Sequence, residues 1–124
     1  MVRDRRLDAG RAAERVAVRY LRRKGLRIVA RNVRLPSGEI DIVARDGDTL
    51  VFVEVRCRAS GRWGTALDAI GPAKQHQVAR VAEAYLTRHP ASACRFDVVG
   101  VTGDVVVHIE DAFRPDDRAF ARTW

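Results

Sequence analysis

The feature that most constrains the fold is a pair of β-type runs that a tight turn separates. The runs cover residues 39–45 and 49–58, and the segment Asp46-Gly47-Asp48 lies between them. An Asp-Gly step between two such runs is typical of a β-hairpin. The second run contains LVFVEV, a nearly continuous apolar stretch, as expected of a strand buried on both faces. The sequence therefore predicts a hairpin whose second strand lies inside a covered sheet.

Two helices and three further strands complete the predicted fold. Apolar residues at helical spacing predict helices at 8–24 and 72–89. The remaining β-type runs predict strands at residues 26–34, 95–101 and 105–110. In the first of these, regular alternation places Leu26, Ile28 and Ala30 on one face. The second helix is a crossover, so the strand after it should lie parallel to a strand before it. The order α-β-β-β-α-β-β predicts an α/β fold, a mixed sheet flanked by helices.

The length and composition indicate one folded unit. A chain of 124 residues suits a single domain, which we expect to span 1–124 with 111–124 as a peripheral tail. Its 47% hydrophobic and 31% charged residues are ordinary for a globular protein and exclude a disordered one. No apolar run approaches the roughly 20 residues that span a bilayer, and the N-terminal segment lacks the apolar stretch of a secretory signal. We therefore expect a cytoplasmic protein with no membrane partner.

The positive charge is concentrated at the N-terminal end. The formal net charge is +7, yet residues 1–35 alone hold twelve Lys and Arg against three Asp and Glu. Four arginines fall on one stripe of the first predicted helix, at intervals of four, four and three residues: Arg11, Arg15, Arg19 and Arg22. Over about 17 Å of helix, such a stripe suits the phosphates of a nucleic acid. The alternative is a solvated helix face.

Three carboxylates gather on the predicted hairpin. Glu39 and Asp41 project to one face of the first strand, and counting outward from the turn places Asp41 nearly opposite Glu54. Carboxylates brought together in a partly buried sheet repel each other, and a divalent cation such as Mg²⁺ or Mn²⁺ relieves that repulsion. The alternative is structural: Glu39 is a turn acid, Asp41 an exposed strand residue, and Glu54 an ion-pair partner of Arg56 or Arg58.

The hairpin segments and part of a later strand resemble those of a known protein family. The segments 38–41 and 46–58, with Arg95-Phe96-Asp97 in a later strand, closely resemble the YraN-like family of uncharacterised bacterial proteins. The resemblance covers residues 9–113. It implies membership of the restriction-endonuclease-like PD-(D/E)XK superfamily, similar to archaeal Holliday junction resolvases. The α-β-β-β-α-β core of that superfamily agrees with the order predicted above.

The resemblance implies roles for the acidic residues. Asp41 corresponds to the metal-binding aspartate, and Glu54 to the acidic residue of the (D/E)XK element. Glu14 corresponds to an accessory acid from the first helix, and Glu39 assists at the edge of the site. The implied metal set is therefore Asp41, Glu54, Glu14 and Glu39, with Mg²⁺ or Mn²⁺ as cofactor.

The chain departs from the motif at one position. Arg56 stands where the motif has lysine, and arginine is bulkier, forked and effectively never deprotonated. Lys74 shares a helix face with Val78, Val81 and Tyr85, so we expect it to point inward and to compensate for the missing lysine. The alternative is a lysine that extends to solvent over a core face.

A loop after the hairpin adds nucleic-acid-binding candidates. Trp63, with Arg58 and Arg62, suits stacking on a base or wedging at a junction. The alternative is a loop anchored by one buried indole.

Together these features predict a Mg²⁺- or Mn²⁺-dependent endonuclease that hydrolyses DNA, including branched or flap structures, with Asp41, Glu54, Arg56 and Lys74 as catalytic residues. The alternative is a nucleic-acid-binding module that Arg56 has impaired catalytically. The partner is nucleic acid, DNA in the leading hypothesis, and the resemblance allows a homodimer.

Overall fold

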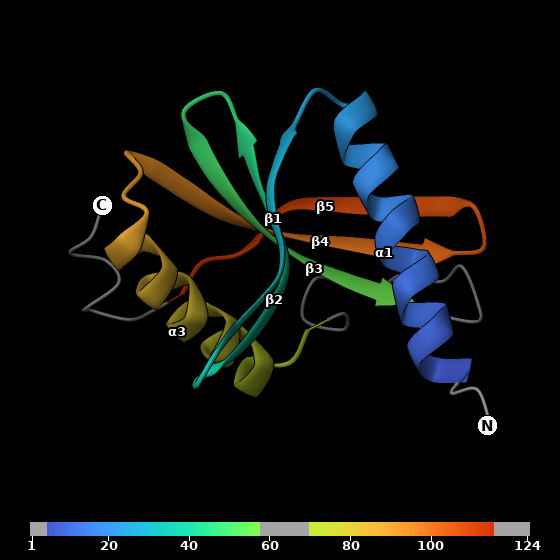
Figure 1. Cartoon of the computed structure of the whole chain (residues 1–124), viewed down its shortest axis with the longest axis horizontal. Coiled ribbons are helices and arrows are strands. Elements are labelled where there is room, and N and C mark those ends of the chain that lie inside the picture. Colours follow the sequence, from blue (N-terminus) through green and yellow to red (C-terminus); the bar gives the residue numbers. More distant parts are fainter. Residues whose placement is uncertain (1–4, 58–69, 116–124) are drawn as a thin grey trace.

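The computed structural model describes residues 5–57 and 70–115, with side chains from Asp8 onward. They form one five-stranded sheet in the order β1-β2-β3-β4-β5, flanked by two helices (Figure 1). Strands β3 and β4 are parallel, and the other neighbouring pairs are antiparallel. The elements are α1 (Arg5–Arg23), β1 (Arg27–Leu35), β2 (Gly38–Asp46), β3 (Thr49–Cys57), α3 (Pro72–Arg88), β4 (Ala93–Thr102) and β5 (Val105–Phe113). The predicted mixed sheet, its element order and the parallel crossover are confirmed for these residues.

The two helices cover opposite faces of the sheet. Buried residues of α1 pack with one apolar cluster, and buried residues of α3 pack with another. The central strand β3 contributes side chains to both clusters, because Phe52 packs under α3 whereas Val51 and Val53 pack under α1. This confirms a strand buried on both faces. Among the described residues, neither helix is long and apolar enough to span a membrane.

Strand β1 does not alternate regularly, so the prediction for its faces was wrong. The pairing with β2 shifts between Ile28 and Ala30. Ile28 therefore packs on the α1 side, whereas Ala30 packs on the α3 side. An irregularity of this kind adds a residue to one strand and exchanges the faces beyond it.

A second irregularity lies farther along the same hairpin. Asn32 has a left-handed φ of 51° between two residues of β1 that pair with Ile42 and Ile40. Beyond this point the faces exchange again, since Ile42 lies in the α1 cluster and Ile40 in the α3 cluster. The position of β2 opposite Asn32 is Asp41. The hairpin thus bends at Asp41, and its tip turns over α3 (Figure 1).

The C-terminal boundary of the fold differs from the prediction. Residues 111–113 are part of β5 and not of a peripheral tail. Phe113 is buried and stacks on Phe96 with ring centroids 5.0 Å apart. The acidic residues Glu110 and Asp111 interrupt the apolar pattern of this strand. Asp111 has a φ of 50°, and the β4–β5 pairing shifts between Phe96 and Val98. The strand continues beyond this irregularity to Phe113.

One glycine fixes the tip of the β1–β2 hairpin against α3. Gly38 has a φ of +146°, and a Cβ atom added there would lie 2.7 Å from Cγ of Gln77. Both the backbone conformation and the close approach therefore require glycine at this position.

We expect Gly38→Ala to lower the free energy of unfolding by about 1–3 kcal/mol, because it adds backbone strain and displaces Gln77. Urea denaturation followed by circular dichroism measures the change. The matched control is Gly10→Ala in α1, where an added Cβ meets nothing within 4 Å. There alanine should stabilise the helix by about 0.5–1 kcal/mol. Equal effects at the two positions would contradict the close packing at Gly38.

Candidate functional site

The β2–β3 register places Asp41 beside Glu54. The outermost pair of that ladder is Ile42 with Val53, and Asp41 and Glu54 are the next residues of the two strands beyond it. Asp41 is half-buried, and its Oδ2 accepts a hydrogen bond of 2.8 Å from the backbone N–H of Val55. The strand backbone therefore holds this carboxylate toward β3 at the point where the hairpin bends.

Burial and mutual repulsion shape the protonation of this pair. Glu54 is 4% exposed, and burial, reinforced by the charge of Asp41, raises its pKa to about 8 against the opposing charges of Lys74 and Arg56. Burial also raises the pKa of Asp41, although the Val55 N–H opposes the change. Within the described residues, Oε1 of Glu54 is buried without a hydrogen-bond partner. The pair is thus an acidic site inside the sheet whose burial favours a proton or another cation on Glu54.

Two cations of different kinds lie near Glu54. Lys74 points inward from α3, with Nζ 3.8 Å from Oε2 of Glu54 and 3.2 Å from Oε1 of Gln77. Arg56 is half-buried on β3, and its Nε is buried without a partner in the described part of the chain. Lys74 of α3 is therefore the side chain at ion-pair distance from Glu54, whereas the Arg56 pairing considered as an alternative does not form. Arg58 lies outside the described residues.

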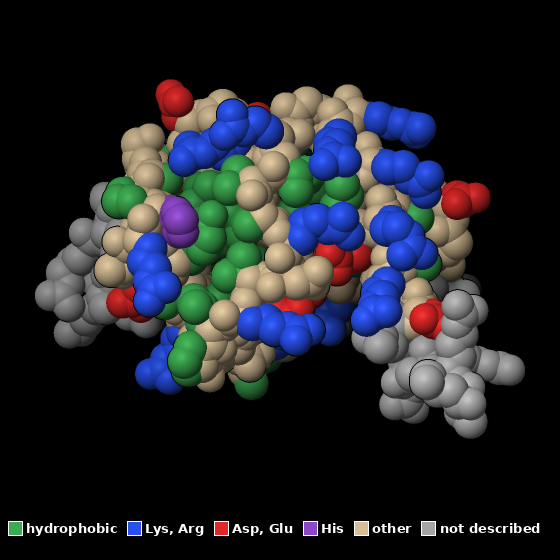
Figure 2. Space-filling model, in the orientation of Figure 1, with side chains coloured by type: hydrophobic (Ala, Val, Ile, Leu, Met, Phe, Trp, Pro, Cys, Tyr) green, Lys and Arg blue, Asp and Glu red, His purple; other side chains and the backbone are tan. Residues whose placement is uncertain are grey.

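An open cavity of about 380 Å³ lies between α1 and the bent hairpin. Its lining residues are Gly10, Arg11, Glu14, Asn32, Arg34, Glu39, Asp41 and Val55. In Figure 2 acidic side chains lie within a ring of basic ones on the face that carries α1. The cavity therefore combines carboxylates at its centre with guanidinium groups at its rim.

The two accessory acids occupy defined positions in this cavity. Glu14 is buried, and its Oε1 accepts hydrogen bonds from Nε of Arg31 at 3.0 Å and Nδ2 of Asn32 at 3.1 Å. Glu39 pairs with Arg34 across the hairpin at 3.4 Å. Glu54 does not line the cavity. No three His, Cys, Asp or Glu side chains converge tightly enough to enclose a metal ion in residues 5–57 and 70–115.

The predicted nucleic-acid-binding residues divide into two groups. The α1 arginines are all exposed on one side of the helix: Arg11, Arg15, Arg19 and Arg22. Arg58, Arg62 and Trp63 lie outside the described residues, so their role stays a prediction.

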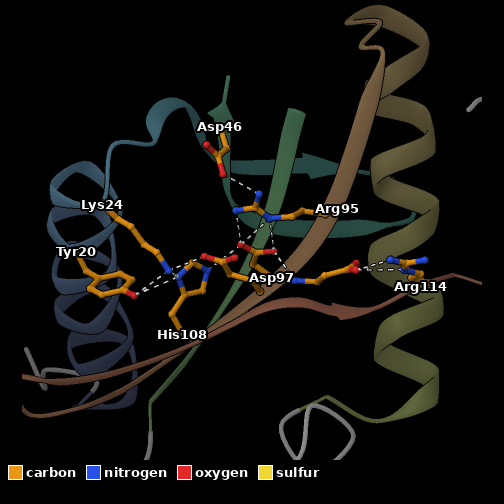
Figure 3. A network of polar contacts seen from close by, with 9 residues as sticks. Tyr20, Lys24, Asp46, Arg95, Asp97, His108 and Arg114 are labelled. Carbon is orange, nitrogen blue, oxygen red and sulfur yellow. Dashed lines mark hydrogen bonds and ion pairs between the residues drawn. The ribbon is translucent and has the colours of Figure 1, made fainter. Parts of the chain in front are cut away.

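The sequence reasoning missed a buried polar network on the α1 side of the sheet (Figure 3). Asp97 on β4 accepts hydrogen bonds from Nε of Arg95 at 3.0 Å, from the N–H of Asp111 at 3.0 Å, and from His108 Nε2 at 2.8 Å. With its proton on Nε2, the His108 ring accepts at Nδ1 from Lys24, 3.1 Å away at the end of α1. The network ties three elements together.

The charge of Asp97 is stabilised despite its burial. Burial alone would raise the pKa of Asp97, but hydrogen bonds from His108, Arg95 and Asp111 together hold it below the usual value. The sequence contained one signal for this network, the alternation of Arg95 with Asp97 on one strand. His108 carried no signal, because its partners lie on other elements.

The raised pKa of Glu54 predicts a pH dependence of stability in metal-free buffer. The folded protein keeps a proton on Glu54 up to about pH 8, whereas the unfolded chain releases it near 4.5. The folded state thus binds more protons between these values, and the free energy of unfolding falls as the pH rises through this window. Glu54→Gln should flatten the profile and stabilise the protein at pH 8.5 by on the order of 1–3 kcal/mol. Parallel profiles for the two proteins, measured by urea denaturation with EDTA, would refute the assignment.

The Asp97 network predicts a large effect on stability. Asp97→Asn removes a buried charge that faces Arg95 and His108, so we expect a loss of about 3 kcal/mol in the free energy of unfolding. Asp104→Asn, in the exposed β4–β5 turn, serves as the control and should change it by less than about 0.5 kcal/mol. A similar small change for both variants would show that the network contributes little.

Comparison with known proteins places the chain in a family. The family described as "Uncharacterised protein family UPF0102" matches residues 13–101. A UPF0102 protein of Nitrosococcus oceani is 45% identical over 114 residues, which cover 86% of this chain and 92% of that protein. A UPF0102 protein of Burkholderia pseudomallei is 51% identical over 110 residues, which cover 87% of this chain and 76% of that protein.

Among solved structures, the crystal structure of SSO0001 aligns with 92% of this chain and 55% of its own, at 16% identity and a TM-score of 0.41. The family match and the curated relatives confirm the resemblance read from the sequence, and the chain belongs to the UPF0102 family.

Proposed function

We propose that this chain is a nuclease that hydrolyses phosphodiester bonds of DNA with the help of Mg²⁺ or Mn²⁺. The observation that carries the proposal is the proximity of Asp41 and Glu54 at the end of the β2–β3 ladder, where the charge of Asp41 helps to raise the pKa of Glu54. Two neighbouring carboxylates are costly to bury unless a positive group joins them. Glu54 nevertheless keeps one oxygen without a partner among the described residues. Such a perturbed pair supports a role in binding and chemistry rather than in stability alone.

The donor set fits a hard divalent cation. Carboxylate oxygens are the ligands that Mg²⁺ and Mn²⁺ prefer, and the orphaned Oε1 of Glu54 is a donor without a protein partner in the described part of the chain. Asp41 and Glu54 would hold the ion directly, and Glu14 or Glu39 would assist through water. When bound, such an ion activates water for attack and stabilises charge on the phosphate.

The cations around the pair act on the substrate. Lys74 lies 3.8 Å from Glu54, where its ammonium counters negative charge that develops on a phosphate oxygen. Arg11 and Arg34 line the cavity, and their guanidinium groups suit hydrogen bonding to a phosphodiester at its mouth. Branched or flap-like DNA presents a strand that can enter an open cavity of this kind. A four-way junction has two strands to cut, which suits two copies acting together.

A second candidate function is a nucleic-acid-binding module without turnover. Arg56 stands where the family resemblance implies lysine, and its buried Nε has no partner in the described residues. A guanidinium stabilises charge but is effectively never deprotonated, so it replaces only part of what a lysine does. The observation that favours the nuclease over this module is Lys74, which brings an amine to the site from α3.

A cleavage assay tests the proposal. Linear, flap and four-way DNA are incubated with the protein and Mg²⁺ or Mn²⁺, and products are resolved on denaturing gels. We expect Asp41→Asn, Glu54→Gln and Lys74→Gln each to lower the cleavage rate by about 100-fold or more. Asp48→Asn, an exposed acid in the β2–β3 turn, is the matched control and should leave the rate unchanged.

Two outcomes decide between the candidates. Cleavage that survives both carboxylate substitutions would refute the nuclease. Absence of cleavage by the natural chain, with activity appearing in Arg56→Lys, would favour the binding module.

A further inference from the structure

A second cavity, of about 250 Å³, lies beside α1 next to the carboxylate cavity. It is lined by Arg15, Val18, Arg19, Arg22 and Arg31. We call it the arginine groove. Three of its arginines belong to the exposed stripe of α1, and the fourth comes from β1. All the charged side chains that line it carry the same sign.

Three of the four arginines that line the arginine groove lack acidic partners in the described part of the chain. Arg15, Arg19 and Arg22 form no ion pair within the described residues. Arg31 does form one, since its Nε lies 3.0 Å from Oε1 of Glu14. Like charges around one cavity repel each other, and an anion that joins them relieves the repulsion.

The arginine groove and the carboxylate cavity share a wall. Glu14 lines the carboxylate cavity and Arg31 lines the groove, so the ion pair between them separates the two spaces. Arg11 lines the carboxylate cavity at the other end of the same stripe. Basic groups therefore continue from one cavity into the other along about 17 Å of α1. Figure 2 shows this run of basic side chains on the face that carries the acidic centre.

We propose that the arginine groove binds backbone phosphates of the nucleic-acid strand whose phosphodiester enters the carboxylate cavity. A guanidinium fork matches the oxygens of a phosphate, and successive arginines match the repeated charge of a nucleic-acid backbone. Phosphate contacts fix the register of a strand but carry no base information, so the groove sets where cleavage falls and not which sequence is cut. Arg31 is a positioning residue that holds Glu14 through Nε while its side chain also lines the groove. The inference rests on the proposed function in taking DNA as the ligand.

The test measures DNA binding without cleavage. The full chain is titrated into a fluorescein-labelled 20-nucleotide single strand and a 20-base-pair duplex in EDTA, and anisotropy is recorded from 50 to 300 mM salt. The double variant Arg19→Ala with Arg22→Ala should bind at least about tenfold more weakly at 100 mM salt. Its dependence of log affinity on log salt should be shallower by about 2.

A matched double variant on the opposite face controls for net charge. Arg80→Ala with Arg88→Ala removes two exposed arginines from α3 and should change affinity by less than about threefold. Arg31→Gln should reduce the salt slope by about 1, and Arg31→Lys should restore it. Melting temperatures establish that each variant folds.

The outcomes separate this inference from the proposed function. Loss of DNA affinity in the groove variants alone supports the groove even if no substrate is cleaved. Equal losses in the groove and control variants overturn it, whether or not the chain cleaves DNA. Stronger binding to vesicles of phosphatidylserine than to DNA, lost in the same groove variants, would assign the groove to a membrane surface and also overturn it.

Discussion

The antiparallel register of β2 and β3 is the constraint on which the rest of the site depends. It brings Asp41 and Glu54 together just beyond its last pair, Ile42 with Val53, in a sheet that helices cover on both faces. A shift of one residue would turn Glu54 away from Lys74 and α3. The apolar side chains on both sides of β3 oppose that shift. It would move Phe52 out of the cluster under α3, and Val51 and Val53 out of the cluster under α1. The packing of the core thus holds the two acids together.

The bend of the β1–β2 hairpin links this pair to the rest of the molecule. Asn32 adopts a left-handed conformation opposite Asp41, and its side chain donates to Glu14 of α1. The same bend directs the hairpin tip onto α3, where Gly38 meets Gln77, the hydrogen-bond partner of Lys74. The bend at Asn32 and Asp41 is therefore in contact with both helices: it meets Glu14 of α1 directly, and Lys74 of α3 by way of Gln77.

The hairpin, the crossover and the inward direction of Lys74 were predictable, because turn residues, apolar patterns and helical spacing are local signals. The faces of β1 were not predictable, because a pattern of alternation does not reveal the irregularity between Ile28 and Ala30 that puts these residues on opposite faces. The extension of β5 over Asp111–Phe113 was missed for a related reason, because an acidic pair interrupts the apolar pattern. The residue that Phe113 stacks on, Phe96, belongs to another strand. The Asp97–His108 contact joins two strands whose sequences carry no sign of it, and only the fold brings them together.

Calorimetric titration of Mn²⁺ into the protein tests the central claim most directly. At pH 7 Glu54, with a pKa of about 8, holds its proton in the metal-free protein. A cation that binds to this carboxylate must displace the proton. Titrations in two buffers of different ionisation enthalpy should therefore show saturable binding with release of about one proton, lost in Glu54→Gln. Absence of binding, or binding that Glu54→Gln leaves unchanged, would contradict the account.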